Sequence, residues 1–214
     1  MGTKTRHFAI EFALLILVLL ILLDAPGAFA RPNTAIPTMH ILVLDYADVP
    51  PRVLAEAEQE TSRIFGPARL QFRWTDCGTR QSPDLPSPCE GTGVAGEIRL
   101  RILPRPLNHN FANSVFGFAT APTYASVYYE SARRLIQTVT DSNSNISVIL
   151  GCLIAHEIGH LLLGTDQHTA SGIMQASWDI HQIQRALRGT LGFSSQQAER
   201  MRQSVAVRVS ASLE

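Results

Sequence analysis

The stretch ISVILGCLIAHEIGHLLLG, residues 146–164, decides how the rest of the chain must fold. Its pattern predicts a single helix that ends at Gly164, because glycine readily adopts the left-handed turn that closes a helix. Apolar side chains lie on nearly every side of this helix, so it has no face suited to water. We therefore expect a central buried helix with the rest of the domain packed around it.

Three residues of this helix, His156, Glu157 and His160, form the pattern H-E-x-x-H. Residues four apart on a helix share one face and lie roughly 6 Å apart along the axis, so both imidazoles can bind one ion. A carboxylate beside them can take a proton from a water that zinc has made acidic. The pattern indicates one catalytic Zn2+ ion with His156 and His160 as ligands and Glu157 as the general base.

A catalytic zinc ion usually has three protein ligands, and two candidates for the third follow the helix. Asp166 lies six residues after His160, and His168 lies eight residues after it. A neutral imidazole suits zinc, whereas a carboxylate adds negative charge and lowers the Lewis acidity of the metal. We expect His168 to be the third ligand and keep Asp166 as the alternative. If His168 binds, Asp166 would cap the turn or accept a hydrogen bond from a ligand imidazole.

The histidines, the glycine bend and the following SGIM (residues 171–174) resemble the metzincin metallopeptidases, whose signature is H-E-x-x-H-x-x-G-x-x-H followed by a Met-turn. The resemblance implies a twisted sheet above the active-site helix, an edge strand that pairs with extended substrate, and Met174 beneath the metal. The spacing departs from the signature, because the glycine comes four residues after His160 and His168 comes eight after it. Asp166 stands at the regular sixth position, where some bacterial metzincins use Asp, so the resemblance leaves the third ligand open.

The segments before and after the central helix predict a mixed sheet. A helix at residues 50–66 separates the first two strands, which implies that these strands are parallel. A last helix is expected at residues 194–209, where Ser194 and Gln197 have the spacing of a capping box. Strands are expected at residues 39–46, 69–77 and 96–104, with short β-prone runs at residues 114–122 and 124–131. The order predicts an α+β domain, with a mixed β-sheet packed on the active-site helix and a C-terminal helix.

One of the two short β-prone runs is expected to be the edge strand, because small and polar residues there would let a peptide backbone approach. Four of their five aromatic residues are expected to pack in the interior rather than to contact substrate. These residues are Phe116, Phe118, Tyr124 and Tyr128.

Residues 1–30 have the features of a secretory signal peptide. Two basic residues precede an apolar run, and the small-x-small pattern at residues 28–30 is typical of a cleavage site. The run is shorter than a usual membrane span. We expect cleavage to release a peptidase domain at residues 31–214; the alternative is an uncleaved anchor at residues 8–23, the chain's only expected membrane contact. With either a cleaved signal peptide or an uncleaved anchor, we expect the domain to lie outside the cytoplasm, as a secreted or periplasmic protein.

The cysteines fit this compartment, because disulfides persist outside the cytosol. Cys77 and Cys89 flank a turn-rich loop, and we expect them to form a disulfide. Cys152 lies in the apolar helix and is expected to be a small core residue.

Charge and motif together define the predicted function. The 18 basic and 18 acidic residues cancel, and no basic stripe with interleaved aromatics occurs, which argues against a nucleic-acid binder. We predict an exported zinc endopeptidase that hydrolyses bonds in peptide or protein substrates, with a metal-activated water and Glu157 as base. The alternatives are a metalloamidase acting on a non-peptide amide and a non-catalytic zinc-binding interaction protein. Glu157 argues against the latter, because a structural zinc site needs no base.

Overall fold

The computed structural model describes residues 36–78, 89, 96–106, 116–139 and 145–210. These residues belong to one compact unit that begins at Ile36. The predicted signal peptide at residues 1–30 lies outside the described residues, so it remains a prediction.

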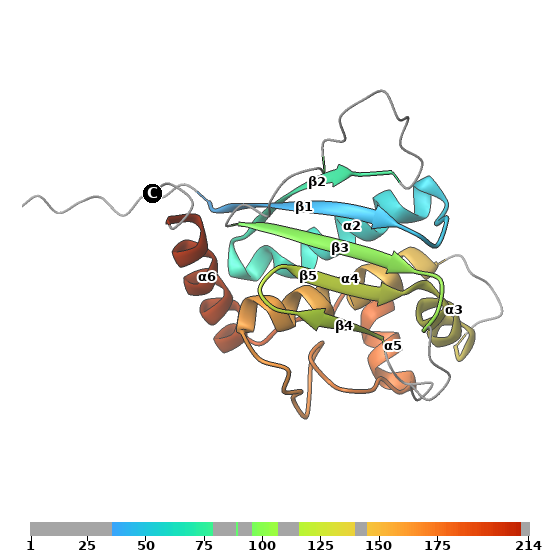
Figure 1. Ribbon diagram of the computed structural model, residues 1–214. Coiled ribbons are helices and arrows are strands. Elements are labelled where there is room, and N and C mark those ends of the chain that lie inside the picture. Colours follow the sequence, from blue (N-terminus) through green and yellow to red (C-terminus); the bar gives the residue numbers. More distant parts are fainter. Residues whose placement is uncertain (1–35, 79–88, 90–95, 107–115, 140–144, 211–214) are drawn as a thin grey trace, which may run out of the picture. The chain divides into compact units, whose positions relative to one another are not determined.

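The strands of this unit form a mixed sheet in the order β2-β1-β3-β5-β4 (Figure 1). Strand β1 (Thr38–Asp45) pairs in parallel with β2 (Gln71–Asp76) on one side and with β3 (Glu97–Leu103) on the other. Strand β5 (Tyr124–Tyr128) continues the parallel part beside β3. Strand β4 (Gly117–Thr120) runs antiparallel to β5 and forms one edge of the sheet, and β2 forms the other. The structure confirms that the two short β-prone runs contain strands and shows that the first supplies the edge.

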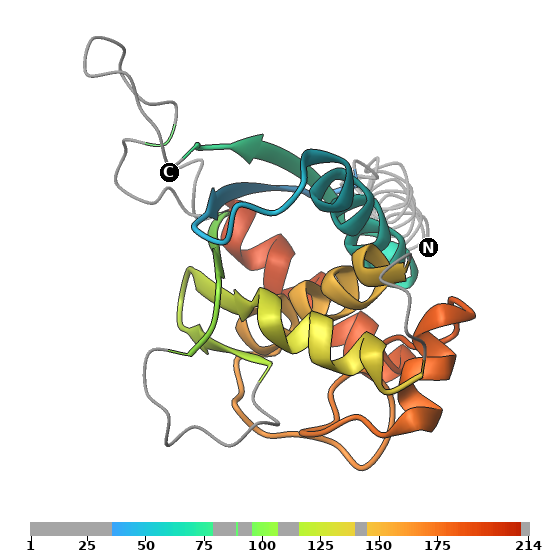
Figure 2. The same ribbon diagram turned by 90° about the vertical axis from the view of Figure 1, so that its right-hand side faces the viewer.

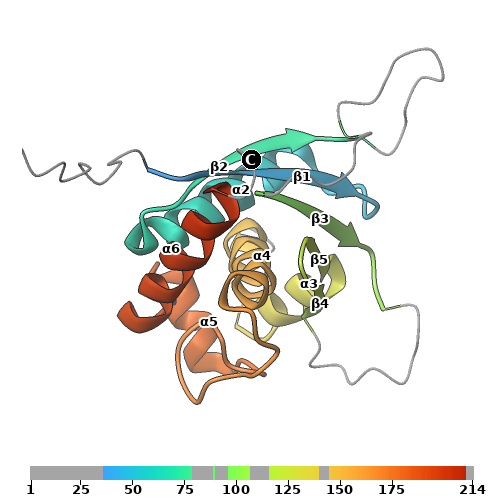
Figure 3. The same cartoon turned by 60° about the vertical axis from the view of Figure 1, so that its left-hand side comes forward.

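Helices cover one face of the sheet, as Figures 2 and 3 show. In β3, Ile98, Leu100 and Ile102 are fully buried, and they alternate with Arg99 and Arg101, which are only partly buried. This alternation places an apolar face against the helices and a polar face on the other side of the sheet.

Helix α2 (Pro51–Phe65) connects β1 with β2, as expected for a parallel pair, and packs closely on α4 (Ile146–Leu163). A β-carbon at Gly151 of α4 would lie 2.7 Å from the carbonyl oxygen of Ala57 in α2. Because that distance is shorter than any ordinary contact, the two helices can approach this closely only where α4 carries glycine.

Helix α4 is the predicted central helix. All its residues except Val148 and Leu163 are buried. It is long and apolar enough to cross a membrane, but 83% of it is buried inside the domain, as in the core helix of a folded protein. Gly164 ends it with φ 64°, and its N–H donates to the carbonyl of His160, which confirms the predicted left-handed termination.

Two short helices were not expected from the sequence. The predicted strand at residues 124–131 is wrong beyond Tyr128, because the chain there enters α3 (Tyr129–Gln137), which buries Ala132 and Ile136. Helix α5 (Ile180–Leu187) lies between the helices predicted at residues 146–164 and 194–209, where no helix was predicted.

Among the described residues, the remaining helical segments are a 3-10 turn, η1 (Gly66–Ala68), and the C-terminal helix α6 (Ser195–Ser210). The predicted capping box precedes α6: the Ser194 N–H donates to Oε1 of Gln197, and the Gln197 N–H donates to Oγ of Ser194. Figure 3 shows α6 beside α4, on the same side of the sheet as α2.

The cysteines are placed as expected. Cys77 and Cys89 form a disulfide and pack on Leu42, on the face of the sheet opposite the helices. Cys152 is fully buried in α4, where burial raises the pKa of its thiol.

Candidate metal centre

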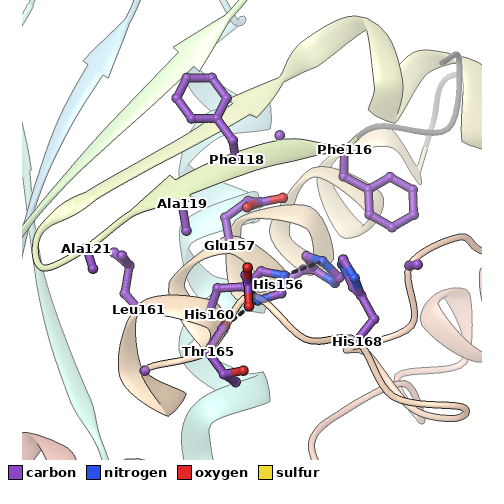
Figure 4. Close-up of a pocket in the computed structure, with 14 residues that line it drawn as sticks. Phe116, Phe118, Ala119, Ala121, His156, Glu157, His160, Leu161, Thr165 and His168 are labelled. Carbon is purple, nitrogen blue, oxygen red and sulfur yellow. Dashed lines mark hydrogen bonds between the residues drawn. The ribbon is translucent and has the colours of Figure 1, made fainter. Parts of the chain in front are cut away.

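Three imidazoles meet at one end of the central helix. His156 and His160 come from α4, and His168 comes from the loop that follows Gly164. One ring nitrogen of each lies within 4.8 Å of the corresponding nitrogens of the other two, and Figure 4 shows the three rings converging. Asp166 is exposed and lines the neighbouring cleft but is not a member of this group. The geometry therefore favours His168 over Asp166 as the third ligand.

The two helix histidines present their Nε2 atoms to each other at 3.1 Å. Nδ1 of His156 lies 2.8 Å from the carbonyl oxygen of Ile173, and Nδ1 of His160 lies 2.8 Å from that of Thr165. A carbonyl only accepts hydrogen bonds, so each neutral ring carries its proton on Nδ1 and leaves a lone pair on Nε2.

Two facing lone pairs at this distance repel unless a cation lies between them. Nitrogen ligands of a tetrahedral zinc ion lie roughly 3.3 Å apart when the metal–nitrogen bonds are about 2.0–2.1 Å. The observed Nε2–Nε2 distance of 3.1 Å matches that requirement. Zinc therefore fits this donor set, and the backbone carbonyls orient the rings for it.

The protonation states also suit metal binding. Burial lowers the pKa of His156 to about 3, and the neighbouring His160 and His168 add to the effect. Burial likewise lowers the pKa of His168. Phe116 packs edge-on against the His156 ring, with centroids 5.3 Å apart, and shields it from water. A histidine that stays neutral at physiological pH is the form that binds a metal.

Glu157 lies beside the three histidines. It is 3% exposed, and Figure 4 shows its side chain between β4 and the histidine rings. Burial raises the pKa of its carboxyl group to about 8. A carboxyl group that readily takes up a proton at the wall of a cleft is suited to proton transfer.

The segment Ile173-Met174 holds two parts of the site through backbone hydrogen bonds. The Ile173 carbonyl accepts the His156 hydrogen bond, and the Met174 carbonyl accepts from the N–H of Thr169, 2.8 Å away, next to His168. Met174 is 1% exposed, and a β-carbon on Gly159 would lie 2.8 Å from its Sδ atom. The structure thus places Met174 directly against the helix turn that carries the metal ligands.

A cleft of about 570 Å³ runs between β4 and α4. Its walls include Gly117, Ala119, His156, Glu157, His160 and His168. Two aromatics differ from expectation: Phe118 lines the cleft and is 41% exposed, and Tyr124 is 39% exposed. The side chains of Phe118 and Tyr124 are exposed to solvent, whereas those of Phe116 and Tyr128 are buried as predicted.

The carbonyls of Ile173 and Thr165 have no signature in the sequence, because every residue has a carbonyl and no side chain marks those that bind a histidine. Asp166 was expected to cap the turn or to accept a hydrogen bond from a ligand imidazole, whereas the Thr165 carbonyl accepts from His160 and the Thr165 hydroxyl accepts from the N–H of Gln167. Trp178, whose ring lies 6.2 Å from that of His156, was likewise not singled out.

In sequence comparisons, no family model and no curated protein matches this chain. In structure, the chain is similar to an archaemetzincin from Methanopyrus kandleri, with a TM-score of 0.51 and 16% sequence identity. The likeness covers 82% of this chain and 99% of that chain. At this identity it establishes the fold alone, and it confirms the predicted α+β, metzincin-like architecture.

Proposed function

We propose that this chain is an exported zinc-dependent endopeptidase that hydrolyses peptide bonds in peptide or protein substrates. One observation carries the proposal: the Nε2 atoms of His156 and His160 face each other at 3.1 Å, with both Nδ1 atoms held by carbonyls. His168 joins them, and Glu157 lies at the same cleft. The metzincin-like fold supports this assignment.

The residues have distinct roles. His156, His160 and His168 would hold one zinc ion, which when bound supplies a Lewis acid for the substrate carbonyl and makes a water more acidic. Glu157 accepts the proton of the attacking water and delivers it to the departing amine. Its burial favours the protonated form, so the proton can stay on the carboxyl group between these two steps.

The edge strand β4 would bind the substrate backbone. Among the described residues β4 pairs with β5 alone, so its other edge is available to an extended peptide. Gly117 and Ala119 line the cleft along this strand, and their small size lets a second backbone approach. Antiparallel pairing here would place one peptide bond of the substrate beside the histidines.

Export is supported by two independent features. Residues 1–30 have the composition of a signal peptide, and Cys77 and Cys89 form a disulfide of the kind that persists outside the cytosol. The peptidase domain would then comprise residues 31–214 and act as a secreted or periplasmic protein. Attachment to the membrane would require residues 8–23 to remain uncleaved.

The test uses purified mature protein and the variant Glu157→Gln. Metal analysis is expected to find about one zinc per chain in both, because the variant keeps all three ligands. Only the parent is expected to digest a peptide library. A parent without zinc would refute the proposal, and zinc binding without Glu157-dependent hydrolysis of peptides would favour a non-catalytic zinc-binding protein. Hydrolysis restricted to non-peptide amides would identify a metalloamidase.

A further inference from the structure

Arg208, near the end of α6, forms hydrogen bonds with both walls of the cleft but does not itself line the cleft. Its Nη1 donates to the carbonyl of Pro122 at 2.9 Å, and its Nη2 donates to the carbonyl of Leu161 at 2.7 Å. Pro122 lies in the turn between β4 and β5, and Leu161 lies in the last turn of α4. One guanidinium therefore connects the edge-strand hairpin with the active-site helix.

These two anchor points lie at one end of the cleft. Ala121, which precedes Pro122, and Leu161 both line it, and Figure 4 shows them together at the end away from Phe116. Ala119 and Gly164 also line the cleft. Ala119, Ala121, Leu161 and Gly164 are small or apolar, so the space between the hairpin and the helix depends on how far apart their backbones are held.

The contact is well suited to fixing that separation. The guanidinium is planar and holds its donors in a fixed geometry, unlike a flexible ammonium group. Leu161 has one of the last four carbonyls of α4, which lack partners within the helix, and a cation there is favoured by the helix dipole. Arg208 is partly buried, and its hydrogen bond to Leu161 is partly buried as well, which limits competition from water for that bond; the bond to Pro122 is exposed.

We propose that Arg208 is a positioning residue that sets the distance between the β4–β5 turn and α4, and so restricts this end of the cleft to small or slender apolar substrate side chains. The part that concerns substrate rests on the proposed function. The part that concerns the cleft wall rests on the two hydrogen bonds alone.

Arg202 provides a matched control on the same helix. It also donates to backbone carbonyls, those of Ala68 at 3.2 Å and Pro67 at 3.4 Å, but these belong to η1 and do not line the cleft. Arg208→Met and Arg202→Met each keep an apolar stem and remove the donors. Both variants lose charged hydrogen bonds to carbonyls. Arg202→Met also loses an ion pair with Glu199, and only Arg208→Met loses the connection between the cleft walls.

The experiment compares the parent and both variants, zinc-loaded, on a peptide library randomised on both sides of the cleaved bond. Arg208→Met is expected to accept bulky aromatic side chains at one position that the parent rejects. For a peptide with alanine at that position, KM is expected to rise about threefold to tenfold while kcat changes less, because uniform binding is lost. Arg202→Met is expected to keep the parent's profile. An unchanged profile in Arg208→Met, or the same broadening in Arg202→Met, would overturn the substrate part.

Hydrogen exchange of the segment 117–128 decides the structural part without any turnover. Arg208→Met is expected to speed exchange in the β4–β5 turn by about tenfold, as expected when a local opening becomes easier. Arg202→Met should leave it unchanged. If the parent cleaves nothing, the proposed function fails, yet this measurement still tests the connection. Equal exchange in the parent and Arg208→Met would refute it.

Discussion

Gly159 and Met174 touch so closely that a β-carbon on Gly159 would lie 2.8 Å from the Sδ atom of Met174. The contact matters because Met174 and the preceding Ile173 hold the backbone hydrogen bonds of the metal centre. The Ile173 carbonyl orients His156, and the Met174 carbonyl holds the loop that carries His168. A displacement of Met174 would therefore disturb ligands from both the helix and the loop.

The same β-carbon would lie 2.8 Å from Cε1 of Phe193, so Gly159→Ala must displace Met174 or Phe193. We predict that Met174 moves and that zinc affinity falls about tenfold to a hundredfold, the usual effect of disturbing groups that orient metal ligands. Alanine is the better helix former, so the loss cannot come from helix propensity. Competition with a chelator of known affinity measures it. Gly151→Ala is the control, since the new β-carbon there meets Ala57 of α2 at 2.7 Å, away from the metal. It should lower the melting temperature with unchanged zinc affinity, and unchanged affinity in Gly159→Ala would contradict the role of Met174.

The third ligand gives a second prediction. His168→Ala should weaken zinc binding by about a hundredfold or more, since a lost ligand costs more than a disturbed one. Asp166→Ala should change it by less than about threefold, because Asp166 is outside the group of converging nitrogens. Each variant controls for the other, because both positions are exposed in the same loop. The reverse ranking in the chelator assay would make Asp166 the ligand.

Much of the fold was predictable because its signals are local. The apolar character of α4 and the glycine at residue 164 placed the central helix and its end, and the alternation of Ile98, Leu100 and Ile102 placed β3. Helix α3 was missed, since it begins after Tyr128 without a side-chain cap and its first residue, Tyr129, continues the β-prone run. The start of α5 did carry a signal: the Asp179 and Gln182 side chains form a capping box.

In the candidate site, too, some features could be predicted from the sequence and others could not. The pair His156 and His160 followed from helix periodicity, because a spacing of four residues is enough to bring their Nε2 atoms together. The position of His168 depends on long-range backbone contacts, such as that between Thr169 and Met174, which have no sequence signature. Arg208 lies 47 positions after Leu161 and 86 positions after Pro122 in the sequence, so no local pattern predicts the connection that it makes between them.

Glu58 of α2 gives a prediction about pH. Burial, helped by the nearby Asp76, raises the pKa of Glu58 to about 7. Because the folded pKa lies above the unfolded value of 4.5, ionisation destabilises the fold as pH rises above 4.5, and the full effect is present above pH 7. After solvent screening is allowed for, the cost is on the order of 1 kcal/mol.

Glu58→Gln should therefore raise the melting temperature by ~2–4 °C at pH 8 and leave it almost unchanged at pH 4.5. Thermal unfolding of the zinc-loaded proteins at both pH values measures this difference. Glu130→Gln, at an exposed position in α3, controls for the loss of one negative charge. An equal change at both pH values would show that the effect comes from packing rather than from ionisation of Glu58.

The disulfide between Cys77 and Cys89 should stabilise the domain without taking part in the metal site. It closes a loop with a sequence separation of 12, for which the loss of unfolded-chain entropy corresponds to about 3 kcal/mol. A reducing agent should therefore lower the melting temperature of the parent by roughly 6–12 °C. The double variant Cys77→Ala/Cys89→Ala should melt at the reduced parent's temperature and should not respond to reductant, because the remaining Cys152 is fully buried. Zinc affinity should be the same in all of these proteins, since the pair packs on the face of the sheet opposite α4; a loss of zinc on reduction would contradict this separation.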